Sequence, residues 1–514
     1  MAKTVTTPRA MVRNTFFNLL MLVSNAVIAF LLVPFFVGRL GKDGFGVWLL
    51  IGDLFRYRIL LGMGLNSAIN RRIPMYLAKD DEDGIRRTVS TALFFFTIIA
   101  VVLAALTFVL AVKVGDWFVI PPEWVRTASG LVLVVGLGFA ASTPLQLTTA
   151  VLSGLQRYDM VSIVTLIIMT IRTAITVILL LRGYGLITLG LIYGISEIVA
   201  RGAQHVLARR LLPIGYISWQ NVDRGLLKEM LFYGMNTFLY AMGALIICRA
   251  SGTVIGIFLP PTQVTIFSTP AMSVLMLSEF LQAFTAAIKP AVSDLDARDD
   301  HSGVRLIAFL TQKYSLLVLI PAAAFLIVMG RQFLTVWVGD EFAEPGMIQS
   351  MANILTILTV GYCMVLSQHS NFLVLAGRGE HRVFGILMAV EAVLCIGSAV
   401  FTLAVLHWGL AGVAWSNLVP MTLVAGIILP VYFHRKMNIR ARESLSQVWR
   451  PALLSTIPSV ALIVVWKHIA PPESWFGLFA VVGAAAGVTL VSAWFFGMGD
   501  IERQRLRSVL KRVR

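Results

Sequence analysis

The sequence predicts an all-α, polytopic membrane protein of about 14 transmembrane helices. The first observation is composition: 58% of the 514 residues are hydrophobic, 13% are charged, and the mean hydropathy is +0.84. A soluble domain carries roughly 25% charged residues, so this chain cannot cover a globular surface with polar groups. The second observation is that the apolar residues form separate runs of roughly 20 residues, the length of one bilayer crossing.

Apolar runs separated by polar breaks define the predicted spans. Each span must be helical, because lipid cannot hydrogen-bond an open backbone. The first run is too long for a signal peptide and is not followed by a small-residue cleavage site, so it counts as a span. The spans are 14–37, 43–69, 89–113, 127–153, 161–182, 184–207, 229–258, 262–288, 304–328, 347–375, 383–405, 408–433, 451–469 and 474–497.

The third observation is the distribution of basic residues among the loops. Even-numbered loops and the two tails hold about 30 of the 42 Lys and Arg residues, whereas odd-numbered loops hold about 7. This bias predicts that both termini are cytoplasmic in a plasma (inner) membrane protein. It also places the net charge of +16 at helix ends that face anionic lipid, so the charge indicates no nucleic-acid partner.

An internal repeat relates the two halves of the chain at a shift of about 222 residues, a signature of duplicated transporter bundles. Ala78–Asp81 recurs as Ala297–Asp300, and Val151–Gly154 recurs as Val374–Gly377. Further matches follow in the same order, which makes coincidence a poor explanation.

The repeat unit contains an even number of spans, so both copies enter the membrane from the same side as a parallel repeat. It predicts an N-terminal six-helix bundle at 1–213 and a C-terminal six-helix bundle at 225–437, joined by the loop Ile214–Arg224. Residues 445–514 add two helices and a basic cytoplasmic tail. Two such bundles usually enclose the substrate path between them.

Charged residues inside the spans are the candidate functional residues. Each costs at least about 2.5–3.5 kcal/mol to insert, so it usually faces protein or water and serves a function. They are Asp53, Arg56, Arg58, Arg172, Glu197, Arg249, Glu279, Lys313 and Glu391.

Span 2 holds three of these charges. Asp53 and Arg56 are three residues apart and share a helix face, so they can pair. Either they neutralise each other, or they form part of a cationic patch for an anionic head group. Arg58 lies about 200° around the helix from Arg56, so one straight helix cannot direct both into one cavity. Either one arginine points elsewhere, or the helix is distorted near Gly62 and Gly64.

Arg249 and Arg56 have no charged counterpart in the other copy of the repeat. Unmatched charges are better candidates for substrate handling than inherited scaffold residues. Arg249 therefore either lines a cavity or is a structural partner of Glu279 or Asp53. Glu279 either neutralises an arginine or binds a coupling proton or sodium ion.

No residue pattern indicates an enzyme, a cofactor or a metal site. The sequence has no Gly-rich phosphate loop and no His/Cys/Asp cluster with metal-ligand spacing. The three cysteines, Cys248, Cys363 and Cys395, all fall inside spans and are expected to be packing residues.

Six short motifs, most of them containing glycine, follow one another along the chain: Arg13-Asn14, Leu40-Gly41, Gly44–Trp48, Gly62–Asn66, Val338–Phe342 and Leu375–Arg378. They resemble motifs of the polysaccharide-export and Wzx-type oligosaccharide flippases. These belong to the multidrug/oligosaccharidyl-lipid/polysaccharide (MOP) superfamily, together with MATE drug exporters and the lipid II flippase. The resemblance covers roughly residues 10–435.

The resemblance implies a pair of six-helix bundles around a cationic cavity, working by alternating access. The substrate would be an undecaprenyl-diphosphate-linked oligosaccharide, flipped from the cytoplasmic to the periplasmic leaflet for cell-surface polysaccharide biosynthesis. Coupling to H⁺ or Na⁺ and work beside a polysaccharide polymerase or ligase are also expected. A diphosphate carries about two negative charges, which suits the arginine fork. We therefore assign substrate binding to Arg56, Arg58 and Arg249, and ion coupling or charge pairing to Asp53 and Glu279.

Three other functions stay open at this stage. A MATE-like exporter of small organic cations would need an acidic cavity, which Asp53, Glu279 and Glu391 could supply, although the arginines oppose it. A lipid II flippase would share the helix plan and a basic cavity. The last alternative is a non-transporting scaffold for a glycan-assembly complex.

Overall fold

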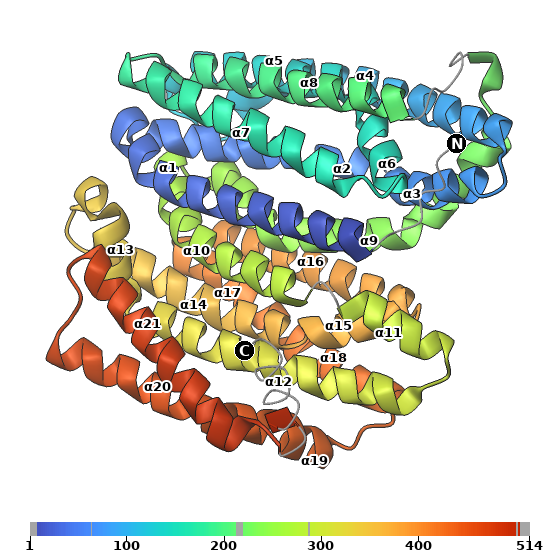
Figure 1. Ribbon diagram of the computed structural model, residues 1–514. Helices are drawn as coiled ribbons and strands as arrows, with labels where there is room; N and C mark the ends of the chain where they lie inside the picture. Colours follow the sequence, from blue (N-terminus) through green and yellow to red (C-terminus); the bar gives the residue numbers. More distant parts are fainter. Residues whose placement is uncertain (1–7, 63, 212–218, 286–287, 500–501, 504–514) are drawn as a thin grey trace. The chain divides into compact units, whose positions relative to one another are not determined.

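The computed structural model describes residues 8–62, 64–211, 219–285, 288–499 and 502–503 (Figure 1). Every regular element in these ranges is helical, which confirms the all-α prediction. By internal contacts the chain divides into two compact units, 1–265 and 266–514. Residues 214–218 of the predicted loop Ile214–Arg224, and the basic tail after Arg503, lie outside the described residues.

The first unit contains helices α1 to α9 and the start of α10. A short 3-10 helix, η1, separates α5 from α6, and another, η2, precedes α9. The helices are α1 (Pro8–Arg56), α2 (Arg58–Leu61), α3 (Leu65–Leu77), α4 (Glu82–Trp117), α5 (Pro122–Ser142), α6 (Gln146–Gly154), α7 (Tyr158–Leu181), α8 (Leu186–Leu211), α9 (Arg224–Phe258) and α10 (Pro261–Thr285).

The second unit contains the rest of α10 and helices α11 to α21. Short π-helical segments continue α17 and α21 and precede α20. The helices are α11 (Ile288–Ala297), α12 (His301–Val328), α13 (Gly330–Val338), α14 (Met347–Ser367), α15 (His369–Gly377), α16 (His381–Ala404), α17 (Gly409–Met421), α18 (Leu429–Lys436), α19 (Ala441–Ser444), α20 (Arg450–Ile469) and α21 (Trp475–Ser492).

The number of spans agrees with the prediction of about 14. Within the described residues, 13 segments are long and apolar enough to cross a membrane. The first of them, Leu20–Leu61, has 42 residues, about twice the length of one crossing. Gly41 interrupts it with φ 72° and ψ 170°, a backbone conformation outside the helical region. The segment therefore holds two spans, as the sequence predicts.

The repeated sequence motifs fold into the same local turns. Asp80 and Asp299, both preceding an N-cap aspartate, adopt φ values of 52° and 55°. The following residues, Asp81 and Asp300, each accept a hydrogen bond from a backbone N–H three residues on, at 2.7 and 2.8 Å. Asparagine and aspartate tolerate the left-handed region better than most residues, and an aspartate N-cap satisfies an exposed helix donor. The same chemistry therefore starts α4 and α12.

A close backbone approach joins span 2 to α9 in the first unit. A Cβ atom on Gly256 would lie 2.7 Å from Leu50 Cδ1, and one on Gly64 would lie 2.4 Å from the carbonyl oxygen of Gly234. Only glycine allows contact this close, as in other membrane helix pairs. The sequence assigns α9 to the C-terminal bundle, yet α9 packs against α1, α3 and α4. The boundaries at 213 and 225 come from the sequence repeat, and the division into two six-helix bundles at these positions stays a prediction.

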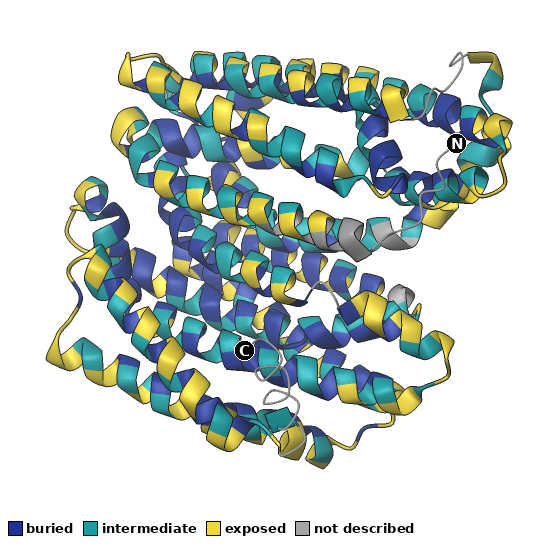
Figure 2. Ribbon diagram, viewed as in Figure 1, coloured by how far each residue is buried: buried dark blue, intermediate teal, exposed yellow. Residues whose placement is uncertain are grey.

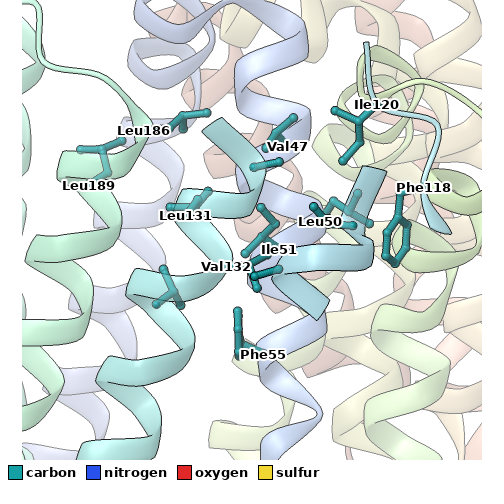
Figure 3. Packing of buried hydrophobic residues seen from close by; sticks show 14 of the residues in the cluster. Val47, Leu50, Ile51, Phe55, Phe118, Ile120, Leu131, Val132, Leu186 and Leu189 are labelled. Carbon is teal, nitrogen blue, oxygen red and sulfur yellow. The ribbon is translucent and has the colours of Figure 1, made fainter. Parts of the chain in front are cut away.

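The core of the first unit surrounds the second half of α1. Figure 3 shows Val47, Leu50, Ile51 and Phe55 of α1 pointing toward side chains of α5 and α8 and of the segment after α4. These four residues are at most 4% exposed. Span 2 is therefore held on several sides by apolar packing.

The two extra C-terminal helices belong to the second unit. α20 and α21 pack against each other and against α12. Buried Met329, Ile463 and Val481 form a small core there. Lys313 of α12 is buried, and its Nζ lies 2.8 and 2.9 Å from the two carboxylate oxygens of Glu502.

Exposed residues recur along many of the helices (Figure 2), and a large number of them are bulky and apolar, as expected of a surface that faces lipid. Ile167, Ile171 and Ile178 are about half exposed on α7, and Phe476 and Phe479 on α21 are 85% and 66% exposed. A soluble protein rarely exposes apolar patches of this extent. The chain is therefore a multi-pass membrane protein.

Replacing Gly64 with alanine is expected to destabilise the first unit. Gly64 has φ +71°, which costs an alanine about 1–2 kcal/mol, and the new methyl group would also overlap the Gly234 carbonyl. The midpoint of thermal unfolding of the purified protein in detergent should fall clearly. Gly202→Ala is the matched control, because Gly202 lies in α8 with nothing within 4 Å of a built Cβ. Equal midpoints for the two variants would contradict the role of this close contact.

Candidate functional site

The α-helix of span 2 is interrupted where it carries its charges. α1 ends at Arg56, the four-residue helix α2 begins at Arg58, and Gly64 takes a left-handed conformation before α3. Both alternatives in the sequence argument are therefore realised: the helix is interrupted, and the two arginines have different surroundings.

Asp53 lies between two arginines. Its Oδ1 is 3.6 Å from Nε of Arg56 and 3.6 Å from Nη1 of Arg249 on α9. The Asp53 side chain is 10% exposed, that of Arg249 20% and that of Arg56 52%. One turn further along, Tyr57 Oη and Thr253 Oγ1 of α9 are 3.4 Å apart. Of the two structural partners considered for Arg249, Asp53 is the one that it faces, and cavity lining stays a prediction.

The charges of this cluster do not cancel. Asp53 contributes one negative charge and the two arginines contribute two positive charges. Arg249 makes no hydrogen bond within the described residues, and its contact with Asp53 is longer than a hydrogen bond. A guanidinium carries five N–H donors. Arg249 therefore keeps donors for an additional acceptor within a membrane-spanning helix.

Arg58 lies in a separate cluster inside the first unit. Its guanidinium lies 3.7 Å from the ring centroid of Phe139, and its Nη2 is 3.7 Å from Glu197 Oε1. Glu197 is also paired with Arg201 of the same helix at 2.9 Å. The structure thus brings Arg56 and Arg249 together with Asp53 but does not bring Arg58 to them. Substrate binding by Arg58 stays a prediction.

The remaining charged candidates have varied surroundings. Glu279 lies half-buried in α10 in the second unit and forms no ion pair within the described residues. Glu391 of α16 is 1% exposed, and its Oε1 has no hydrogen-bond partner among the residues that the structure describes. The Arg172 guanidinium lies 4.4 Å from the ring centroid of Tyr193.

Sequence reasoning missed two partnerships. It assigned no partner to Lys313, which pairs with Glu502 some 189 residues away. It also gave Glu197 no arginine, although Arg201 one turn later is a local signal that could have been used.

The described residues contain no group of three or more His, Cys, Asp or Glu side chains placed to hold a metal ion. Cys395 is buried, and Cys248 and Cys363 are partly buried. Within the described part of the chain, none of the three forms a disulfide.

The chain belongs to a family described as "Polysaccharide biosynthesis protein". The family's sequence model matches residues 40–345, more than half of the 514 residues. This stretch includes the Asp53–Arg56–Arg249 cluster. No curated protein matches the sequence.

Solved structures of MOP transporters share the fold. The inward closed structure of lipid II flippase MurJ aligns with a TM-score of 0.69 at 15% identity, covering 92% of this chain and 98% of that one. An inward-facing MATE-family multidrug resistance transporter aligns with a TM-score of 0.64 at 16% identity, covering 80% and 94%. A MOP transporter from Pyrococcus furiosus, described as having a binding pocket of reverse polarity, aligns at 0.57 and 15% identity, covering 84% and 95%.

These findings confirm the resemblance to the polysaccharide-export flippases at the level of family and fold. The protein is therefore a multi-pass membrane protein of the polysaccharide-biosynthesis family, with the fold of MOP-superfamily transporters.

Removing the shared carboxylate is expected to destabilise the protein. Asp53→Asn leaves two guanidinium groups close together without their anion, and the free energy of unfolding should fall by about 1–3 kcal/mol. Thermal unfolding in detergent measures the change. Asp53→Asn combined with Arg249→Gln should recover part of the loss, because one of the two opposing cations is then gone.

Asp116→Asn is the matched control. Asp116 is 65% exposed and pairs with Lys113 at 2.9 Å, and such a surface pair contributes about 0–1 kcal/mol. If Asp53→Asn unfolded at the same temperature as this control, the carboxylate would have no role in holding the arginines.

Proposed function

We propose that this transporter flips an undecaprenyl-diphosphate-linked oligosaccharide from the cytoplasmic to the periplasmic leaflet of the inner membrane. The observation that carries the proposal is Arg249, a membrane-embedded arginine with unused donors beside a carboxylate that is already shared with Arg56. Buried arginines of this kind suit phosphate oxygens, because the guanidinium fork can donate two parallel hydrogen bonds.

The diphosphate is proposed to take the place of Asp53 as the principal counter-charge of Arg249 during transport. At 3.6 Å the Arg249–Asp53 contact is weak enough for a diphosphate, with about two charges, to compete with it. Asp53 stabilises the arginines while no substrate is bound. The family match supports a role in polysaccharide biosynthesis, and the fold shared with MOP transporters supports alternating access as the mechanism.

The proposal also covers the orientation of the chain in the membrane, its coupling ion and its partner proteins. Both termini face the cytoplasm, as the positive-inside bias predicts. Glu279 is proposed to bind the coupling H⁺ or Na⁺, or to act as a charge partner. A polysaccharide polymerase or ligase on the periplasmic side would consume the flipped lipid.

Arg249→Ala is expected to slow flipping at least tenfold. Losing a hydrogen bond to a charged group costs about 1.5–3 kcal/mol, which is one to two orders of magnitude in affinity. The measurement follows a fluorescent undecaprenyl-diphosphate oligosaccharide in proteoliposomes, with an impermeant quencher reporting the outer leaflet. Arg56→Ala should show a smaller defect, because its side chain is more exposed.

Arg172→Ala is the matched control, since Arg172 is also a membrane-helix arginine of the first unit but lies apart from Asp53. It should flip at close to the wild-type rate. Full flipping by the combined Arg56, Arg58 and Arg249 alanine variant would contradict a cationic substrate site. Preferential transport of lipid II or of an organic cation by the wild type would instead favour one of the alternative substrates.

A further inference from the structure

A recess separate from the Asp53 cluster lies along the N-terminal part of α9. Its volume is about 330 Å³, at the lower end of ligand pockets. Six side chains from the first three turns of α9 line it: Arg224, Leu227, Lys228, Leu231, Phe232 and Met235.

The recess combines two cations with an apolar wall. Arg224 and Lys228 are one helical turn apart, are exposed, and form no ion pair within the described residues. Leu227 and Leu231 form the base, where they pack against the buried residues of α3, α4 and α6. Phe232 stands 69% exposed beside them. An amphiphile with a phosphate head and a hydrocarbon chain matches this distribution of charge and apolar surface.

The neighbouring acids do not neutralise these cations. Glu229 follows Lys228 on α9, and it is paired with Arg72 of α3 at 2.6 Å. Asp223 accepts a hydrogen bond from the backbone N–H of Leu226 at 3.0 Å as the N-cap of the helix. Arg71 of α3 lies over the Tyr233 ring at 4.9 Å and adds a further positive charge nearby.

The recess and the Asp53 cluster share one face of the same helix. Arg249 is 25 residues after Arg224, which at about 100° per residue places the two within about 20° of each other around the axis. Met235 and Arg249 are separated by about 21 Å along α9 at about 1.5 Å per residue. α9 is a continuous helix from Arg224 to Phe258, so it connects the two cationic positions directly.

We propose that the recess on α9 is a loading site, where the diphosphate of the polyprenyl lipid binds before it reaches Arg249. This inference rests on the proposed function. Arg224 and Lys228 bind the two phosphates, and the first isoprene units lie along Leu231 and Phe232. Loading and translocation then use successive parts of one helix.

Binding of glycan-free undecaprenyl diphosphate to the full-length protein tests the loading site. The protein is placed in nanodiscs of zwitterionic lipid, and Phe232→p-benzoylphenylalanine provides a photo-crosslinker in the recess. Crosslinking to undecaprenyl diphosphate is expected, and Arg224→Ala with Lys228→Ala should weaken binding at least about tenfold. Arg209→Ala with Arg210→Ala is the matched control, because it removes two exposed cations from the end of α8 and should leave binding unchanged.

The outcomes separate the loading site from the proposed function. Equal binding by the Arg224/Lys228 variant and the wild type, with loss only in the Arg249 variant, would overturn the loading site and leave the function standing. No binding by the wild type would overturn both. Equal weakening in the Arg209/Arg210 control, or equal crosslinking to phosphatidylglycerol, would show a general attraction to anionic lipid and overturn the loading site.

Discussion

The arrangement of the first unit depends on one buried carboxylate that faces two arginines. Asp53 can reach Arg249 only because span 2 and α9 approach closely, with Leu50 against Gly256 at one point and Gly64 against Gly234 at another. A charge inside a membrane helix is costly unless it has a partner, so Asp53 makes the arginines tolerable in the absence of substrate. Since one anion faces two cations, the cluster remains positive and suited to a further anion.

This arrangement separates the arginines of span 2 by role. Arg56 borders the cluster and is half exposed, whereas Arg58 stacks on Phe139 and faces Glu197 within the bundle. Helix geometry accounts for the difference, since Arg56 and Arg58 lie about 200° apart around the axis and Tyr57 between them keeps a right-handed helical backbone (φ −63°, ψ −14°). An arginine in a membrane span can therefore border a cluster with excess positive charge or pack beside a carboxylate within the bundle, depending on the helix face that it occupies.

Patterns local in sequence predicted most of the fold, and contacts distant in sequence did not follow from them. Apolar runs place the spans within a few residues, because lipid imposes helix length and hydrogen bonding on each segment independently. The repeated Asp80 and Asp299 turns likewise depend on neighbouring residues. In contrast, the choice of Asp53 rather than Glu279 as the partner of Arg249, and the pairing of Lys313 with Glu502, depend on which helices pack together. The cost of a charge in the membrane identifies these residues as candidates from sequence alone. Their ion-pair partners cannot be identified in the same way.

An experimental structure of the wild-type protein with bound undecaprenyl diphosphate tests the central claim most directly. The account predicts a phosphate oxygen within hydrogen-bond distance of the Arg249 guanidinium, about 2.7–3.2 Å. The Asp53–Arg249 separation should then exceed its value of 3.6 Å without substrate. A diphosphate bound elsewhere, with Arg249 still beside Asp53, would contradict the account.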